Sequence, residues 1–297
     1  MKTMKRLSYL VIAGLMFMAS CDESTIDFDA TDEQNIENEA VTDAYFEDVD
    51  DLAALAVSSD AATLTGGKEG SSGRMVNKPN DHRWNCPGVV ITIEVGANST
   101  LQLPQGVITI DFGAGCEDDR GNVRKGKIII TYNGRRFFPG SSIVTTFDGY
   151  EFNGILIEGV RTLTNVTGSL EENPTFTITI VGGKVTWPDG TIATREVSHT
   201  REWVRASNPL NDQWIVTGSA AGINRHGVEY AMEITKPLVY KRRCAFELRI
   251  ILPVEGTKVF TSGDKEVIID FGNGECDNLI TVTVNGISRE IEVGNRN

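Results

Sequence analysis

Five cysteines are the residues of this 297-residue chain whose type and spacing most clearly indicate chemistry. They are Cys21, Cys86, Cys116, Cys244 and Cys276. A cysteine can bind a metal, act as a nucleophile or oxidise to a disulfide, and its surroundings decide among these uses. The sequence contains no Cys-x-x-Cys spacing of the kind that binds zinc. In an oxidising compartment, the four cysteines after Cys21 would form two disulfides, for which three pairings are possible.

The first twenty residues have the pattern of a secretory signal peptide, with three positive charges, no acid and an apolar run from Leu7 to Ala19. That run is too short to span a bilayer comfortably. It ends in Ser20-Cys21, and the sequence around this point resembles the lipobox of bacterial lipoproteins. The resemblance implies that residues 1–20 are removed and that Cys21 becomes a lipid anchor. The alternative is an ordinary secretory signal followed by a fortuitous cysteine.

The charge of the chain is concentrated in one stretch. Removing residues 1–20 would move the net charge from −13 to −16, and residues 22–60 hold fourteen acids and no base, whereas residues 61–297 are nearly balanced. We therefore predict no nucleic-acid partner, because that would need a basic surface. Acidic residues directly after Cys21 are similar to the signals that send lipoproteins of Bacteroidetes-type bacteria to the cell surface, although a self-repelling spacer explains them equally well.

An internal duplication is the most specific pattern in the rest of the chain. Residues 86–138 and 244–293 each contain a cysteine, an apolar stretch, an Ile-Asp-Phe-Gly loop, a second cysteine and a final Asn-Gly. If each copy is an antiparallel hairpin, its two cysteines face each other across the open end. The registers that result pair Val95 with Val107 and Leu252 with Ile268. We therefore predict two disulfides, Cys86–Cys116 and Cys244–Cys276, with a crossed pairing between the copies as the competing arrangement.

Alternation of apolar and polar residues predicts β strands throughout the region after residue 84. The predicted strands are residues 89–95, 107–112, 127–132, 176–181, 191–197, 214–218, 228–234, 246–252, 267–271 and 280–284. Turn signals lie between them, at residues 133–134, 148–149, 153–154, 182–183, 188–190 and 285–286. This pattern predicts an all-β antiparallel meander, arranged as a sandwich or as a curved open sheet.

The region before the strands divides into three parts. Residues 21–36 are expected to form an acidic tether, and residues 61–83 a flexible Gly- and Ser-rich linker before the β domain of residues 84–297. Between them, residues 37–60 have apolar side chains at three- and four-residue intervals, which predicts one amphipathic helix. We expect that helix to pack against the β domain, because a membrane-surface helix would usually carry Lys or Arg.

The order of these motifs also resembles a family. Cys86-Pro87, the Ile-Asp-Phe-Gly-x-Gly-Cys of residues 110–116 and the Asp-Phe-Gly-x-Gly-x-Cys-Asp-Asn of residues 270–278 are similar to a group of uncharacterised Bacteroidetes-type envelope lipoproteins. The resemblance covers nearly all of residues 84–297. It implies a cell-envelope location, as an outer-membrane lipoprotein facing the periplasm or the cell surface. It implies no catalytic residue, because the family has no assigned activity.

Acidic loops next to the second cysteine of each copy provide oxygen ligands of the kind that Ca²⁺ prefers. The calcium candidates are Asp111, Asp118, Asp270 and Asp277, with Glu117, Asp119, Asn273 and Glu275 nearby. Neither loop matches an EF-hand. The alternative is that Asp111 and Asp270 cap turns, with no metal bound.

Other residue types give little indication of catalysis. His199 and His226 each precede an acid by three residues on predicted strands, where the two side chains would point to opposite faces, so we expect solvated or hydrogen-bonded histidines there and no metal site. His82 has no obvious partner. The sequence has no Gly-x-Ser-x-Gly elbow and no phosphate-binding loop. We therefore predict no enzymatic activity and no cofactor.

Aromatic residues on the predicted strands give one candidate for ligand stacking. Trp203 lies between Glu202 and Arg205, so a half-exposed indole is plausible there, whereas packing in the core is the alternative. The function predicted from these patterns is a lipid-anchored, non-catalytic structural or binding module of the cell envelope, with an envelope protein or a glycan as partner. A glycan-binding or carbohydrate-active lipoprotein and a periplasmic amphiphile carrier are the alternatives.

Overall fold

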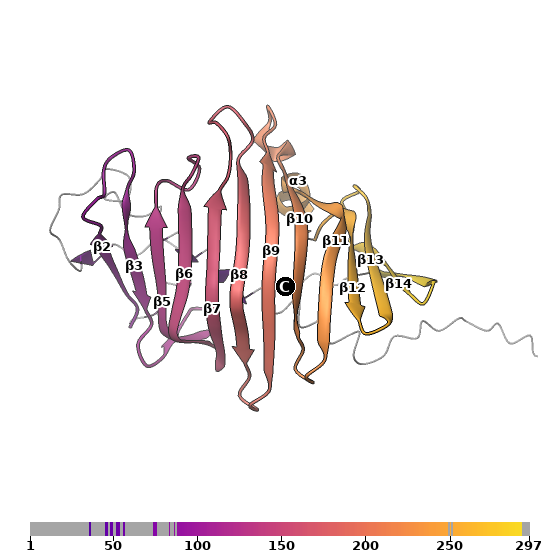
Figure 1. Ribbon diagram of the computed structural model, residues 1–297, viewed down its shortest axis with the longest axis horizontal. Coiled ribbons are helices and arrows are strands. Elements are labelled where there is room, and N and C mark those ends of the chain that lie inside the picture. Colours follow the sequence, from indigo (N-terminus) through magenta and orange to yellow (C-terminus); the bar gives the residue numbers. More distant parts are fainter. Residues whose placement is uncertain are drawn as a thin grey trace, which may run out of the picture.

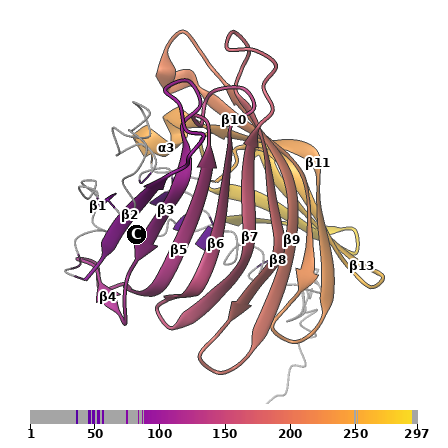
Figure 2. The same cartoon turned by 60° about the vertical axis from the view of Figure 1, so that its left-hand side comes forward.

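The computed structural model describes residues 36, 45–46, 48–49, 52–53, 56, 74–75, 83, 86, 88–248, 250 and 252–292. One antiparallel sheet makes up nearly all of this region (Figure 1). Its strands follow one another in chain order, except that β4 pairs only with β5. The sheet is open and strongly curved (Figure 2). The predicted antiparallel meander is therefore confirmed, and of the two predicted arrangements the structure has the curved open sheet.

Most strands are long. Their bounds are β1 Arg74–Met75, β2 Val90–Val95, β3 Gln105–Asp111, β4 Cys116–Glu117, β5 Val123–Asn133, β6 Ser142–Phe152, β7 Ile155–Asn165, β8 Thr175–Thr186, β9 Ile192–Val204, β10 Gln213–Ile223, β11 Glu229–Lys241, β12 Glu255–Ser262, β13 Lys265–Asn273, β14 Leu279–Val284 and β15 Ile287–Glu292. Two short helical elements are η2 Pro209–Asn211 and α3 Arg242–Leu248. The sequence analysis missed β6, β7, β12 and β15, as well as the two-residue strands β1 and β4.

The predicted strand at residues 246–252 is wrong, because α3 covers its first half. Alternating apolar residues over so few positions do not separate a strand from a helix. Most residues of α3 are good helix formers. The Arg243 Nε and Glu247 Oε2 atoms lie 4.0 Å apart as an i,i+4 pair. The helix places Cys244 in a small separate core with Ile250 and Val254.

Both predicted strand registers are also wrong. In the first copy, Val107 pairs with Glu94 and not with Val95, so the register is shifted by one residue. In the second copy, Val267 pairs with Phe260 on β12. β12 comes after residues 246–252, which were predicted as the partner strand. The predicted registers assumed that each cysteine lies on a strand of the hairpin. Cys116 instead begins β4, after a glycine-containing loop.

Glycine bulges let the long strands bend. The residues 148–149 and 182–183, predicted as turns, lie inside β6 and β8, where the register shifts. Gly126 on β5 faces the first of these bulges and has a φ of 74°. A Cβ atom at this position would collide with the carbonyl group of Gly149. Bulges of this kind increase local twist and bend a sheet. By contrast, the predicted Asn153-Gly154 and Asn285-Gly286 turns do join β6 to β7 and β14 to β15, each with two positive φ angles.

The main core lies on the concave face of the sheet. Alternate residues of the strands are buried there, such as Ile108, Ile130 and Val197. The described residues of the predicted helix at 37–60 are in helical conformation, and all except Asp48 belong to the same core or pack against it. We call these residues the N-terminal cover: Tyr45, Phe46, Asp48, Val49, Leu52, Ala53 and Ala56. The Phe46 ring lies 5.9 Å from that of Phe147 on β6.

Several predictions lie outside the described residues. They concern the signal peptide at residues 1–20, the anchor Cys21, almost all of the tether at residues 21–36, the remaining residues of the predicted helix and most of the linker at residues 61–83. His82 also lies outside them.

Candidate functional site

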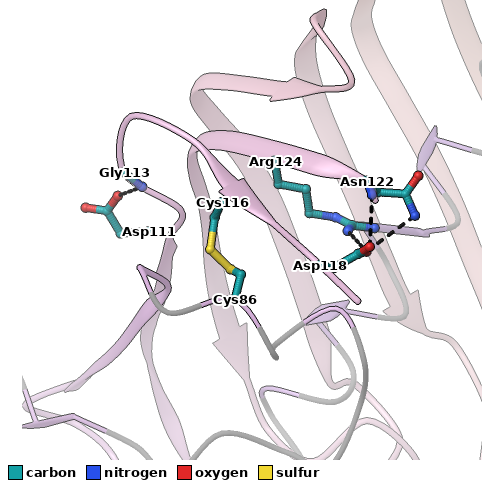
Figure 3. The surroundings of a disulfide bond; sticks show 7 residues. All are labelled: Cys86, Asp111, Gly113, Cys116, Asp118, Asn122 and Arg124. Atoms are coloured by element: carbon teal, nitrogen blue, oxygen red, sulfur yellow. Dashed lines mark hydrogen bonds and ion pairs between the residues drawn. A yellow bond between two sulfur atoms is a disulfide. The ribbon is translucent and has the colours of Figure 1, made fainter. Parts of the chain in front are cut away.

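Two disulfides lie near opposite edges of the sheet. Cys86 is bonded to Cys116 and Cys244 to Cys276, with Cα–Cα distances of 5.5 and 5.3 Å. These are the two predicted pairings. The first bond joins the chain just before β2 to β4 (Figure 3). The second bond joins α3 to the loop after β13, so it ties a helix to the sheet and does not close a hairpin.

A buried charge network lies beside the first disulfide. We use this name for Asp48, Arg83, Asp118 and Arg124. The Arg124 guanidinium on β5 donates to Asp118 at 2.9 Å and to Asp48 at 3.0 Å, and Arg83 donates to Asp48 at 3.0 Å. Arg124 and Asp118 side chains are 3% and 1% exposed, whereas Asp48 is 30% exposed. The network therefore connects the N-terminal cover to the sheet by charge-assisted hydrogen bonds.

The network keeps its groups ionised. Burial works to raise the pKa of the Asp118 carboxyl, but the backbone N–H groups of Asn122 and Arg120, together with Arg124, hold that pKa below its usual value. Burial works to lower the pKa of Arg124, but Asp48 and its other partners raise it overall. Burial raises the pKa of the Tyr150 hydroxyl despite the nearby Arg124 charge, so this phenol stays neutral. The result is a fixed ion pair between Asp118 and Arg124.

More arginines point to the concave face on β7 and β9. Arg195 is 0% exposed and Arg161 is 2% exposed, although lone guanidinium groups are rarely buried this fully. Arg161 pairs with Ile180, which in turn pairs with Val197, so all three lie in one row of the concave face. Arg195 alternates with Val197 on the inward side of β9.

The same inward side of β9 continues with His199, Arg201 and Trp203. We call Arg161, Arg195 and Arg201 the concave cations. These three arginines and His199 each have an interaction partner within the protein. An apolar floor with cations set into it fits an elongated partner that is apolar on one side and anionic on the other.

Trp203 lies in an aromatic cluster at one end of β8–β10. The cluster consists of Phe137, Phe176, Trp203 and Trp214. The Trp203 ring stacks on Trp214 with centroids 5.7 Å apart, and its indole N–H donates to Asp212 at 3.1 Å. Because Trp214 covers one face of the ring and Asp212 takes the N–H group, the geometry favours packing over the predicted sugar stacking.

The acidic loops form turns. Asp111 accepts a hydrogen bond from the Gly113 N–H at 2.8 Å, and Asp270 accepts one from the Gly272 N–H at 2.8 Å. Asp118 points away from Asp111, on the other side of the disulfide (Figure 3). Within the described part of the chain, no three His, Cys, Asp or Glu side chains lie close enough together to hold one metal ion. The turn-capping alternative therefore describes Asp111 and Asp270.

Asp270 and Asp277 do border one hollow, of about 440 Å³, which also contains Glu290 and Lys236. Asp277 accepts a hydrogen bond from the Leu279 N–H at 3.1 Å and thus also shapes its own turn. A larger hollow of about 630 Å³ crosses β9–β13 and is lined by small residues such as Ser198 and Ser219 with scattered glutamates.

The histidines are separated from the acids that follow them. His199 points to the concave face, whereas Glu202 lies on the opposite face and accepts from the Asn173 amide. This agrees with the prediction for that pair. His226 lies in the turn between β10 and β11 and not on a strand, because Asn224 caps that turn by accepting from the N–H groups of His226 and Val228.

The sequence analysis missed the concave cations and the charge network. One signal was present, because residues 195–203 alternate as Arg-x-Val-x-His-x-Arg-x-Trp, with polar or acidic residues between. Such a strand has a cationic face that the fold must bury or expose. The charge network gave no such signal, because Asp48 and Arg124 are 76 residues apart in the sequence and their contact leaves no local pattern.

Comparison with known proteins adds no assignment: no protein-family model, no curated protein and no solved structure matches this chain. Within the described residues, none of the helices has the length and apolar character needed to cross a membrane.

Proposed function

We propose that the protein is a lipid-anchored, non-catalytic binding module of the cell envelope, and that the concave face of its sheet is the binding surface. One observation carries this proposal. The sheet is a single open layer whose concave face combines a buried apolar floor with buried arginines, and residues of the N-terminal cover pack on that floor. A surface of this kind takes an elongated partner along its length.

The proposed location depends on the N-terminus and the disulfides. The lipobox-like sequence before Cys21, the two cysteine pairs and the resemblance to Bacteroidetes-type envelope lipoproteins all favour export. Acyl chains on Cys21 would hold the module at a membrane surface, because each buried methylene contributes about 0.8 kcal/mol. The acidic residues that follow would then separate the sheet from the lipid.

The absence of catalysis is part of the proposal. The charged side chains buried on β7 and β9 are Arg161 and Arg195, and arginine stays protonated at physiological pH. It can therefore hold an anion but is a poor general acid or base. A second candidate, an amphiphile carrier, is favoured by the same combination of apolar floor and inward cations. A glycan binder is less well supported, because Trp203 packs inside the aromatic cluster.

The binding proposal is tested by identifying what stays bound to the protein after gentle extraction from its own envelope. We would compare the wild type with Arg161→Gln and Arg195→Gln by native mass spectrometry, followed by lipid, glycan and protein identification. The matched control is Arg225→Gln, since Arg225 forms an exposed pair with Asp189. We expect a ligand that the concave variants lose and the control retains. Identical bound material in all four proteins, or none in any, would overturn the proposal.

The anchor is tested separately by the mass of the mature N-terminus. We expect an acylated Cys21 and, for Cys21→Ser, loss of the protein from the membrane fraction. An unmodified chain that begins elsewhere would remove the anchor from the proposal and leave the binding surface unaffected.

A further inference from the structure

We propose that the concave face is a receptor for an acidic amphipathic helix, and that its occupant is the stretch of residues 36–60 of the same chain, whose carboxylates pair with the concave cations. This inference rests on the proposed function, because it names the kind of partner that the binding surface accepts. In this state the surface is occupied by the chain itself, and an outside partner of similar chemistry would have to displace residues 36–60.

The apolar half of the interaction is already visible. Phe46, Val49 and Leu52 follow one another at three-residue intervals, which places them on one side of a helix, and each is at most 1% exposed. They belong to the same core as the floor of the sheet. Tyr45 adds a ring contact with Phe152 on β6, with centroids 5.8 Å apart. One side of the stretch is therefore buried against the concave face.

The charged half is visible at one point. Asp48 lies between Phe46 and Val49 and pairs with Arg124 and Arg83, at 3.0 Å in each case. The stretch therefore docks through an acid as well as through its apolar side chains. Arg124 is 3% exposed, so this contact lies out of water in the docked state.

The concave cations extend the same pattern along the sheet. Phe46 contacts β6, and the order β6-β7-β8-β9 places Arg161 one strand away and Arg195 three strands away. Strands lie roughly 4.8 Å apart, so these distances are about 5 and 14 Å. A helix over residues 36–60 would be about 37 Å long, which is enough to reach both.

Charge complementarity selects this occupant. Residues 36–60 carry eight acids and no base. They are Glu37, Glu39, Asp43, Glu47, Asp48, Asp50, Asp51 and Asp60. Anions beside a buried guanidinium group stabilise it, and an acidic segment docked on the concave face can bring carboxylates to such groups, as Asp48 does for Arg124. Residues 36–60 belong to the run of residues 22–60, which holds fourteen acids and no base, and they are the part of that run whose described residues pack in the core of the sheet.

The test supplies the stretch as a separate molecule. The mature full chain carrying Leu52→Asp should release its own stretch, because a carboxylate replaces an apolar side chain in the core. A synthetic peptide of residues 36–60 is then titrated into this variant and into the wild type, with binding followed by fluorescence anisotropy. The control peptide has all eight acids replaced by the matching amides. We expect saturable binding to the variant, at least about tenfold weaker binding to the wild type, and at least about tenfold weaker binding of the amide peptide.

Equal binding of both peptides would overturn the role of the carboxylates, and no binding to the folded variant would overturn the docking itself. Disulfide mapping and near-ultraviolet circular dichroism show whether the variant is folded. If it is not, the eight amide substitutions are made in the full chain, and an unchanged unfolding midpoint would overturn the inference. If the peptide experiment fails but Arg161→Gln still loses an envelope ligand, the proposed function stands and the docking is overturned. If the peptide binds as expected but no envelope ligand is found, only the intramolecular docking stands.

Discussion

Each of the two copies of the repeat forms one disulfide, but the segments that carry the first cysteine differ in structure. In both, an aspartate caps the glycine turn that precedes the second cysteine, at the same N–O distance of 2.8 Å. In the first copy, Cys86 precedes a strand, whereas in the second copy Cys244 lies in α3. The loop is therefore the part that the duplication preserves, and the segment after the first cysteine is free to become a strand or a helix.

The acids after the second cysteine differ as well. Asp118 of the first copy is buried against Arg124, whereas Asp277 of the second copy is exposed and only caps its own turn. The first copy lies where the N-terminal cover meets the sheet, and the second copy lies near the far edge. Burial by a neighbouring segment, and not the motif itself, thus converts a turn acid into part of an ion-pair network.

Removing either disulfide should have the largest effect. The two bonds close loops of similar length, with sequence separations of 30 and 32. The loop-entropy model therefore gives about 4 kcal/mol for each. We expect Cys86→Ser/Cys116→Ser and Cys244→Ser/Cys276→Ser to lower the free energy of unfolding by similar amounts in urea titrations. A difference above about 2 kcal/mol would show that native contacts, and not loop closure, dominate one of the bonds.

Replacing the acids should separate the copies. Asp118→Asn removes a buried charge-assisted bond to Arg124, so we expect a loss of about 2 kcal/mol in the free energy of unfolding. Asp277→Asn keeps the oxygen that accepts from Leu279, so we expect a change below about 0.5 kcal/mol. Equal losses from the two variants would mean that the buried network adds nothing to the stability of the first copy.

At acid pH, the difference in stability between wild type and Asp118→Asn should report the titration of Asp118. Its folded pKa lies below the usual 3.8, so its contribution is fully present above that pH and is lost as the pH falls through the folded pKa. The difference in stability between wild type and Asp118→Asn should therefore shrink below about pH 4. Urea unfolding at a series of pH values measures this difference, and Asp277→Asn serves as the control. A difference that stays constant down to about pH 2 would contradict the lowered pKa.

Loss of the shared turn cap should have the same, modest effect in both copies. Asp111→Ala and Asp270→Ala each remove one hydrogen bond to a glycine N–H, which is worth about 1 kcal/mol. We expect the two losses, measured by thermal unfolding, to agree within about 0.5 kcal/mol. A much larger loss at Asp270 would indicate that its second bond, to the Thr257 hydroxyl, matters more than the shared turn.

Local patterns in the sequence predicted much of the fold and little of the binding surface. Alternation and Asn-Gly pairs are local, so they gave the meander and the hairpins at Asn153-Gly154 and Asn285-Gly286. Gly149 and Gly183 were misjudged, because a glycine bulge inside a strand has the same local composition as a turn. β6 and β7 were missed because threonine and glycine interrupt their apolar runs.

The cysteine pairing was correct although both registers were wrong. Order along the duplicated motif was enough to choose the partners, whereas register depends on loop conformation that residue counting does not include. The contact between Asp48 and Arg124 depends on how the sheet curves around residues far away in the chain. No periodicity reports such a contact. The inward direction of Arg195, by contrast, follows from its alternation with Val197 on β9, a local signal that the sequence analysis did not use.

Hydrogen–deuterium exchange of the mature chain tests most directly whether residues of the N-terminal cover lie on the concave face. The comparison is between the wild type and Leu52→Asp, both with intact disulfides. We expect amides of β5 and β6, which carry Arg124 and Phe147, to exchange at least about tenfold faster in the variant, with β15 at the far edge unchanged. Unchanged exchange in β5 and β6 would contradict the docking of the N-terminal cover on this surface.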